Sequence, residues 1–371
     1  MRFPFEPGFG LLGGTVINTE SSLAAVLPVL KAAHWIAIDT EADSLHAYPE
    51  KLCLIQISHA TGDVLIDPLS PIELQPRFFN ILHDHQLIFH GADYDLRLLK
   101  KTFDFVPTRI FDTMLAARLL GYEQFGLSNL VARVLGIELE KGPQKMDWAR
   151  RPLTPRMETY ARNDTVYLKP LSDFLKEELN KTGRLAWQEE LCARLIADSS
   201  QVITPDPDEV WRLKGSDRLS HKALTLLREL WWWRESEARE SNKPPFFVVE
   251  HHTLTRWACE LADGKTLQES LGSRRMSSGR IARLTSVVAR ALQIPKEKYA
   301  RPRARKFHRR LKPSEHARFE ELKEHRDKAA LGLGIDPTLI ASKSMLYELA
   351  QADGAPGLDL MSWQRQLLFS R

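Results

Sequence analysis

Short apolar runs separated by polar residues mark the first third of the chain. The runs with strand character are WIAID (35–39), KLCLIQIS (51–58), DVLID (63–67) and QLIFHG (86–91). The first three follow one another through short connections, which predicts an antiparallel meander. The fourth follows a helical stretch, IELQPRFFNILHDH, so we expect it to lie parallel in the same sheet after a crossover.

Helical periodicity then takes over, across 93–103, 109–120, 127–135 and 155–180. Thr154 precedes Pro155 and is a plausible N-cap of the last of these helices. Beyond about residue 190 the strand signals nearly vanish. The pattern predicts an α/β fold, with a mixed sheet flanked by helices, followed by all-helical modules.

The helical rear half contains a possible internal repeat. LLRELWWWRESEARESNKPP and FEELKEHRDKAALGLGIDP each combine a helix with a Pro-marked turn, which indicates two copies of one module without a strict period. Between them lies RPRARKFHRRLK (301–312), with seven Arg or Lys among twelve residues. We therefore expect a basic linker between the two copies.

Charge divides the chain into two unlike halves. Residues 1–190 hold 20 Lys and Arg against 25 Asp and Glu, a balance of −5, whereas residues 191–371 hold 32 against 23, or +9. This split favours metal chemistry in front and capture of a polyanion behind. Solvated helix faces would explain the basic half equally well.

Several classes of protein are disfavoured. The N-terminus lacks the pattern of a signal peptide, and no apolar run is long enough to span a bilayer. The three cysteines are far apart with no CxxC, so a reducing cytoplasm is expected. DGKT (263–266) lacks the earlier glycine of a phosphate-binding loop, because that position is Cys259, so we expect no ATP. We expect a monomer without a membrane partner.

Three acids at alternate positions follow the first predicted strand. Asp39, Glu41 and Asp43 in WIAIDTEADS would point the same way from an extended chain. Carboxylates gathered on one face repel each other unless a cation offsets their charge. By itself such a group is more often a solvated turn.

Two later segments supply further acids. Asp95 follows the fourth strand in FHGADYDLRLL, and Asp164 lies on a helix with Tyr160 one turn before it. Strand ends beside helix starts form the crevices where α/β folds place their sites. All-oxygen ligands favour Mg²⁺ or Mn²⁺, and two such ions can catalyse phosphodiester hydrolysis. Tyr160 could then orient the attacking water.

The ordered motifs IDTEADSL, FHGADYDLRLL and YARNDTVYL resemble those of the ribonuclease D family, in the DEDDy branch of the DnaQ-like 3′–5′ exonucleases. The resemblance covers about residues 30–180 and implies a ribonuclease H-like fold. It also implies two bound Mg²⁺ or Mn²⁺ ions, with Asp39, Glu41, Asp95 and Asp164 as ligands and Tyr160 as the residue that orients water. Asp43 has no counterpart among the family's catalytic acids.

The rear half resembles the HRDC domain, a helical nucleic-acid-binding module. We predict an exonuclease domain over 1–190, an HRDC domain over 210–296, a basic linker over 297–312 and a diverged second copy over 313–371. Arg274 and Arg275 are predicted to bind substrate phosphates, in a stretch that also contains Arg280 and Arg283. The adjacent Trp231, Trp232 and Trp233 cannot share one helix face, so at least one should be in the core.

Two residues near the predicted site have less specific signals. His90 ends the fourth strand and is a candidate for substrate contact, although a packing histidine has the same pattern. Lys145, in KMDWARR before the catalytic helix, is a candidate for phosphate contact, and a plain surface loop is the alternative.

The expected function is hydrolysis of single-stranded RNA 3′ ends to nucleoside 5′-monophosphates by a two-metal mechanism, with tRNA precursors as the suggested substrates. A DNA 3′–5′ exonuclease would use the same metal site, since discrimination depends on contacts to the 2′-OH. A catalytically silent RNA-binding protein is a third possibility, although the intact set of five residues argues against it.

Overall fold

The computed structural model describes residues 16–140, 142, 144–201, 204–303, 310–351 and 359–369. These residues divide into two compact units. The first unit holds the described residues up to 42, those from 52 to 201 and those from 310 onward. The second holds residues 43–51 and the described residues from 204 to 303.

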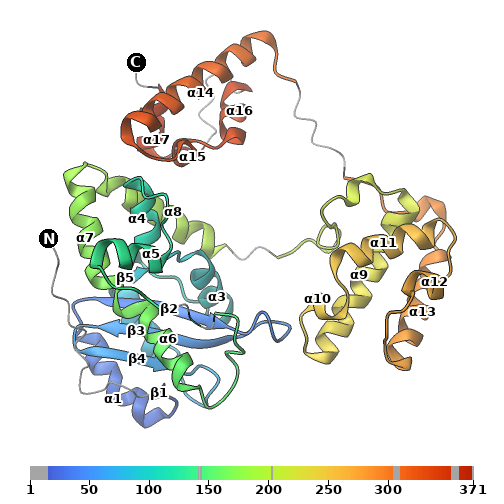
Figure 1. Ribbon diagram of the computed structural model, residues 1–371, viewed down its shortest axis with the longest axis horizontal. Coiled ribbons are helices and arrows are strands. Elements are labelled where there is room, and N and C mark those ends of the chain that lie inside the picture. Colours follow the sequence, from blue (N-terminus) through green and yellow to red (C-terminus); the bar gives the residue numbers. More distant parts are fainter. Residues whose placement is uncertain are drawn as a thin grey trace. The chain divides into compact units, whose positions relative to one another are not determined.

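A mixed sheet forms the centre of the first unit (Figure 1). Its described strands, in the spatial order β1-β4-β3-β2-β5-β6, are β1 (Val16–Ile17), β2 (Ile36–Ala42), β3 (Leu52–His59), β4 (Gly62–Ile66), β5 (Gln86–Phe89) and β6 (Arg109–Asp112). β2, β3 and β4 pair antiparallel, whereas β5 is parallel to β2 and to β6. The predicted meander and the predicted parallel strand are both confirmed.

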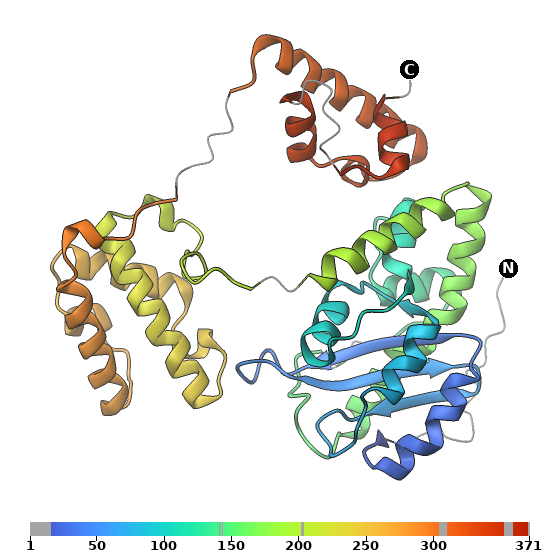
Figure 2. The same ribbon diagram turned by 180° about the vertical axis from the view of Figure 1, so that it is seen from behind.

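Helices cover both faces of this sheet. The helices of the first unit up to residue 200 are α1 (Glu20–Lys31), α2 (Arg77–Asp84), α3 (Asp93–Phe103), α4 (Thr113–Leu119), α5 (Leu127–Leu130) with the π-helical turn Val131–Leu135, α6 (Pro155–Val166), α7 (Leu168–Lys181) and α8 (Leu185–Ser200). The helices α1, α2 and α3 share one core with the strands, and α6 packs on the opposite face (Figures 1 and 2). Alternation along β2 sends Ile36 and Ile38 into the first core and Ala37 toward the other side.

The predicted helix over 109–120 was wrong at its beginning. Residues 109–112 form the strand β6, because Ile110 and Phe111 are buried and the segment pairs with β5. The side chain of Asp112 then caps α4 by accepting hydrogen bonds from backbone N–H groups. Farther along, the helix predicted over 155–180 is divided at Tyr167 into α6 and α7.

The C-terminal module shares a hydrophobic core with α4, α7 and α8. Its helices are α14 (Pro313–Leu333), α15 (Pro337–Ile340), α16 (Lys343–Gln351) and α17 (Ser362–Phe369). Trp187 of α8 stacks on Trp363 with ring centroids 4.8 Å apart. The buried guanidinium of Arg184 donates hydrogen bonds to the carbonyl oxygens of Leu119 and Leu333, at 2.6 and 2.8 Å. The module thus packs as part of the first unit.

The second unit is helical, apart from its loops. Its helices are α9 (His221–Ser241), α10 (Pro245–Val248), α11 (His251–Ala262), α12 (Leu267–Leu271) and α13 (Ser278–Leu292), with 3₁₀ turns at Ser216–Arg218 and Lys296–Lys298. Trp233 is buried in its core and Trp232 is 39% exposed, as expected for adjacent tryptophans on one helix. Thr266, the last residue of DGKT, caps α12 in a capping box with Glu269.

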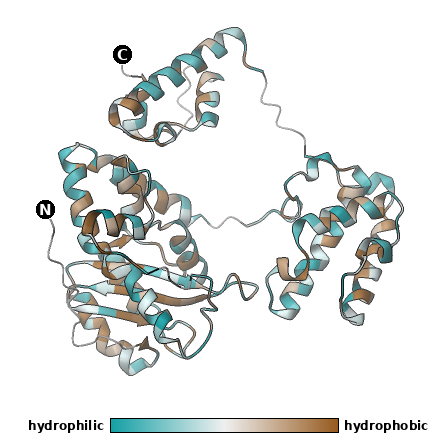
Figure 3. Ribbon diagram, viewed as in Figure 1, coloured by the Kyte–Doolittle hydropathy of each residue, from teal (hydrophilic) through white to brown (hydrophobic). Residues whose placement is uncertain are grey.

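Figure 3 shows hydrophobic residues along the strands and hydrophilic residues over much of the helices. No helix in the described part of the chain is both long and apolar enough to cross a bilayer. Residues 304–309 of the predicted basic linker, and residues 1–15 of the predicted exonuclease domain, lie outside the described residues.

Candidate active site

Three of the predicted metal ligands meet at one place. Asp39 and Glu41 are alternate residues of β2, and Asp164 lies on α6. Carboxylate oxygens from these three residues all lie within 4.8 Å of one another. They line an open cavity of about 810 Å³ together with Tyr160 and His90. The remaining walls come from the start of α5 and from the segment between the π-helical turn and α6.

Asp95 is held beside this group by a neighbour on β2. It lies in the first turn of α3 and is 6% exposed, and its Oδ1 accepts a hydrogen bond of 2.5 Å from Thr40 Oγ1. Asp93, the other acid of that turn, instead forms an exposed ion pair with Arg97. The environment of Asp95 is therefore the one expected of a site carboxylate.

Burial raises the pKa values of all four acids, and repulsion from neighbouring carboxylates adds to the effect. The pKa of Asp39 lies well above its ordinary value, first because of burial and then because of the charges of Asp95, Asp164 and Glu41. Burial raises the pKa of Glu41 to about 9, and the pKa values of Asp95 and Asp164 to about 7. A cation among these oxygens would reverse the effect. The donor set therefore fits a hard divalent cation such as Mg²⁺ or Mn²⁺.

Tyr160 projects into the cavity from α6, one turn before Asp164. The Asp164 carboxylate and the side chain of Gln144 both act on the pKa of its hydroxyl, Asp164 raising it and Gln144 lowering it. Burial, reinforced by the Asp164 charge, raises the pKa of Tyr160, so the phenol keeps its proton at neutral pH. The backbone of Gly142 lies directly on the Tyr160 ring, since a Cβ at this position would be 1.4 Å from a ring carbon.

The segment KMDWARR is anchored beneath the site. Trp148 is buried, and its ring centroid lies 6.1 Å from that of Tyr160. Arg151 forms two hydrogen bonds of 2.6 Å to Asp67 at the end of β4. These contacts hold Trp148 and Arg151 in place, and the phosphate contact predicted for Lys145 stays a prediction. Lys145 is exposed and does not line the cavity, although the preceding residue does.

His90 is a wall of the cavity with an internal partner. Its Nδ1 lies 2.9 Å from Thr113 Oγ1, which donates to the carbonyl oxygen of Phe89. Burial lowers the pKa of His90, and the charge of Asp112 opposes that effect. His90 therefore presents a neutral ring at the mouth of the cavity.

Asp112 is a supporting residue that the sequence interpretation missed. Its fully buried carboxylate accepts hydrogen bonds from four backbone N–H groups, those of Gly91, Ala92, Met114 and Leu115, at 2.8 to 3.2 Å. It thereby ties the turn before α3 to the start of α4. The sequence signal for this role was an aspartate at the N-cap of a helix. The predicted helix over 109–120 placed Asp112 inside the helix, so it was not recognised as a cap.

The sequence interpretation also did not single out Gln56, on β3. It stands opposite Asp39 in the antiparallel pair of β2 and β3 and is fully buried. Neither its Oε1 nor its Nε2 has a hydrogen-bond partner among the described residues. A buried amide without partners costs stability, which is common at functional sites.

Asp43, which has no counterpart in the family motif, does not line the cavity. It is fully buried at the turn after β2, where its Oδ1 accepts a hydrogen bond of 2.7 Å from the Lys51 backbone N–H. Its Oδ2 also lies 3.4 Å from Lys51 Nζ. Asp43 therefore stabilises the turn after β2.

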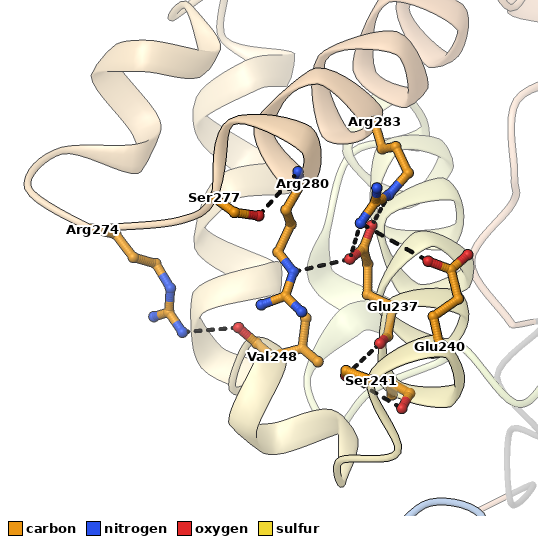
Figure 4. A network of polar contacts seen from close by, with 9 residues as sticks. Glu237, Glu240, Ser241, Val248, Arg274, Ser277, Arg280 and Arg283 are labelled. Atoms are coloured by element: carbon orange, nitrogen blue, oxygen red, sulfur yellow. Dashed lines mark hydrogen bonds and ion pairs between the residues drawn. The ribbon is translucent and has the colours of Figure 1, made fainter.

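The four arginines of GSRRMSSGRIAR have two different environments, and Figure 4 shows Arg274, Arg280 and Arg283. Arg280 and Arg283 both hydrogen-bond to the buried Glu237, with Arg280 Nε and Arg283 Nη2 2.9 and 2.8 Å from its Oε2. These bonds, Arg283 first, lower the pKa of Glu237. Arg274 and Arg275 are exposed, and Arg274 points toward α10 (Figure 4).

Family models and relatives agree with this geometry. The chain matches a 3′–5′ exonuclease family over residues 15–180 and the HRDC domain over residues 223–262. Ribonuclease D of Jannaschia sp. is 30% identical over 348 residues, covering 90% of this chain and 88% of that protein. Ribonuclease D of Zymomonas mobilis is 38% identical over 244 residues, covering 64% of this chain and 62% of that protein.

The structure is also similar to solved ones. Escherichia coli RNase D, described as an exoribonuclease involved in structured RNA processing, matches with a TM-score of 0.71 at 26% identity. That match covers 95% of this chain and 96% of the other, which confirms the expected fold. The chain therefore belongs to the ribonuclease D family of 3′–5′ exoribonucleases.

Proposed function

We propose that the cavity between β2 and α6 hydrolyses RNA from its 3′ end and releases nucleoside 5′-monophosphates. The observation that carries this proposal is the group of three half-buried carboxylates within 4.8 Å of one another, beside Tyr160 and within reach of the charge of Asp95. So concentrated a negative charge repels a phosphodiester unless cations intervene. A cation-dependent phosphodiesterase is the chemistry that this arrangement supports best.

Asp39, Glu41, Asp95 and Asp164 are the residues that would hold two divalent cations, Mg²⁺ or Mn²⁺. When bound, such ions lower the pKa of a bound water and offset charge on the attacking and leaving oxygens of a phosphodiester. The charges of the other three acids all act on Asp39, so it would hold a cation together with them.

Tyr160 positions the attacking water. Its phenol keeps its proton at neutral pH, and its oxygen has a lone pair that can accept a hydrogen bond from that water. Attack on the last phosphorus breaks the bond to the 3′-oxygen of the preceding nucleotide. The products are a 5′-monophosphate and an RNA with a new 3′-hydroxyl.

The proposed substrates are RNAs with single-stranded 3′ ends, tRNA precursors among them. We propose that the enzyme acts on them as a monomer in the cytoplasm. The description of the Escherichia coli relative, which acts in structured RNA processing, supports this class of RNA. His90 and Lys145, together with Arg274 and Arg275 of the HRDC module, are our candidates for substrate contact.

A time course on a hairpin RNA with a 3′ tail tests the proposal. With Mg²⁺ or Mn²⁺ we expect stepwise shortening of the tail and release of 5′-monophosphates, and we expect EDTA to stop both. A DNA of the same sequence runs in parallel. Faster digestion of the DNA would favour the alternative substrate, and intact RNA in the presence of either ion would favour a silent RNA-binding protein.

A further inference from the structure

Two aromatic side chains of α10 are unusually exposed in the second unit. Phe246 is 45% exposed and Phe247 is 61% exposed. Their ring centroids are 4.7 Å apart with the planes at 36°. Phe246 also borders an open cavity of about 540 Å³ that Pro245, Glu250 and His251 help to line. Two phenyl rings exposed to water lack the stabilisation that burial would give. Such a pair is typical of a binding site.

Cationic residues precede α10 in the chain and contact its last residue. Lys243 lies just before α10 and is exposed. Arg274 donates a hydrogen bond of 3.0 Å to the carbonyl oxygen of Val248, the residue after Phe247, which holds its guanidinium beside α10 (Figure 4). Arg275 is exposed next to it. Among the described residues, none of these three cations has an ion-pair partner. The nearby acid Glu250 pairs with His252 at 3.1 Å.

The second helical copy shows what this surface looks like when protein covers it. Helices α9 and α14 each have 21 residues, and each is followed by a four-residue helix that begins with proline. Arg234 donates to the carbonyl oxygen of Val249, and Arg326 donates to that of Ala341. The two arginines (234 and 326) and the two acceptor residues (249 and 341) are separated by the same number of residues, which defines one offset between the copies. The structure thus supports the internal repeat predicted from sequence.

At this offset the two copies differ in chemistry. Phe247 corresponds to Leu339, and Lys243 corresponds to Ile335; both partners in the second copy are apolar and 7% exposed. Phe246 corresponds to Thr338, whose hydroxyl bonds to the capping residue Asp336. One copy buries an aliphatic surface in a protein core, whereas the other exposes aromatic rings among cations.

We propose that Phe246 and Phe247 form a stacking platform for the bases of single-stranded RNA, with Lys243, Arg274 and Arg275 binding its phosphates. Aromatic rings interleaved with cations are the arrangement that captures unpaired nucleic acid, because every base has a π-face and every linkage a charge. Unpaired cations beside the rings favour a polyanion over another protein surface. The choice of RNA over DNA rests on the proposed function.

Binding measurements on the full chain test the platform. We use an Asp39→Asn background in EDTA and a fluorescein-labelled, unstructured 16-mer RNA. Stacking is worth about 1–3 kcal/mol per base, so replacing both Phe246 and Phe247 by Ala should weaken binding at least tenfold. Arg274→Gln should weaken it severalfold and reduce its dependence on salt. A DNA 16-mer should lose affinity in proportion, since stacking does not require the 2′-OH.

Two controls separate this surface from general effects. Leu331→Ala removes an exposed apolar side chain (84% exposed) from the second copy, and Arg256→Gln removes an arginine of α11 that pairs with Glu260. Both should bind RNA as the parent does. Photocrosslinking from 4-thiouridine should label the peptide that contains Phe246 and Phe247.

Wild-type affinity in the double Phe variant, or crosslinks confined to other peptides, would overturn the proposal. The proposal would also be overturned if the double Phe variant changed the sedimentation of the protein without changing its affinity for RNA. That result would identify the two rings as a contact between protein molecules. The assay measures binding in EDTA, without divalent cations, so these results are independent of whether the cavity hydrolyses RNA.

Discussion

Thr40 and Asp95 are joined by a hydrogen bond of 2.5 Å across 55 residues of sequence. The bond links the end of β2, which carries Asp39 and Glu41, to the first turn of α3. The Thr40 hydroxyl donates to Oδ1 of Asp95 and so orients a carboxylate that is distant in sequence. A side chain outside the proposed ligand set thereby holds one of the proposed ligands in place.

Thr40→Val should lower activity without unfolding the chain. Valine has the same shape but cannot donate, and hydrogen bonds to charged groups are worth about 1.5–3 kcal/mol. We expect kcat/KM to fall roughly tenfold or more, and half-maximal activity to require more Mg²⁺. Thr40→Ser keeps the hydroxyl and should restore both quantities. Equal losses in the Ser and Val variants would mean that packing of the methyl group, and not the hydrogen bond, is what matters.

Gln56→Met should separate stability from function. Methionine removes both unpartnered polar atoms at nearly constant volume, so the free energy of unfolding in urea should stay level or rise by about 1 kcal/mol. If the amide serves the neighbouring Asp39, activity should fall at the same time. A variant that is more stable and fully active would show that Gln56 has no role in the site.

The pH dependence of stability follows from the raised pKa values. The folded chain keeps protons on Glu41 up to a pKa of about 9, and on Asp95 and Asp164 up to about 7, whereas the unfolded chain loses them near pH 4. Between about pH 4 and pH 9 the folded state binds more protons, so metal-free stability should fall as pH rises. Stability should be greatest below that range, as far as these groups are concerned.

Mg²⁺ should reverse this trend, because it binds the deprotonated carboxylates. The increase in melting temperature on adding Mg²⁺ should therefore be larger at pH 8 than at pH 6. An Asp39→Asn variant is the control and should show a much smaller increase at both pH values. An increase that is independent of pH in the wild type would contradict the proposed ligand set.

Gly121→Ala should loosen the C-terminal module. Gly121 has φ +81°, and a Cβ there would lie 2.0 Å from the carbonyl oxygen of Gly334 in that module. We expect a loss of at least about 1 kcal/mol and faster proteolysis of the module. Gly332→Ala is a matched control, because it lies in α14 with no atom within 4 Å of the added Cβ. It should be neutral or slightly stabilising.

The sequence predicted the parts of the site that are locally encoded. Asp39, Glu41 and the Tyr160–Asp164 pair stand in short motifs whose strand or helix spacing already indicates which side chains share a face. Thr40 and Gln56 could not be predicted in this way. The Thr40–Asp95 hydrogen bond and the position of Gln56 opposite Asp39 exist only after the sheet has formed.

The same limit explains the errors in the fold. Arg109–Asp112 has no strong local strand signal, and pairing with β5 decides its conformation. Val16–Ile17 is a strand of two residues that exists through its pairing with β4. The antiparallel meander, in contrast, was predictable because each of its strands has its own apolar run bounded by polar residues.

The central claim is that Asp39 holds the cations and Asp43, four residues later, does not. Single-turnover hydrolysis of a 3′-tailed RNA in Mg²⁺ tests it most directly, with Asp39→Asn and Asp43→Asn compared after circular dichroism confirms that both are folded. We predict that Asp39→Asn lowers the rate at least 10³-fold and that Asp43→Asn stays within a few-fold of the wild type, since asparagine can still accept the Lys51 N–H. Substantial hydrolysis by Asp39→Asn, or equal losses in both variants, would contradict the account.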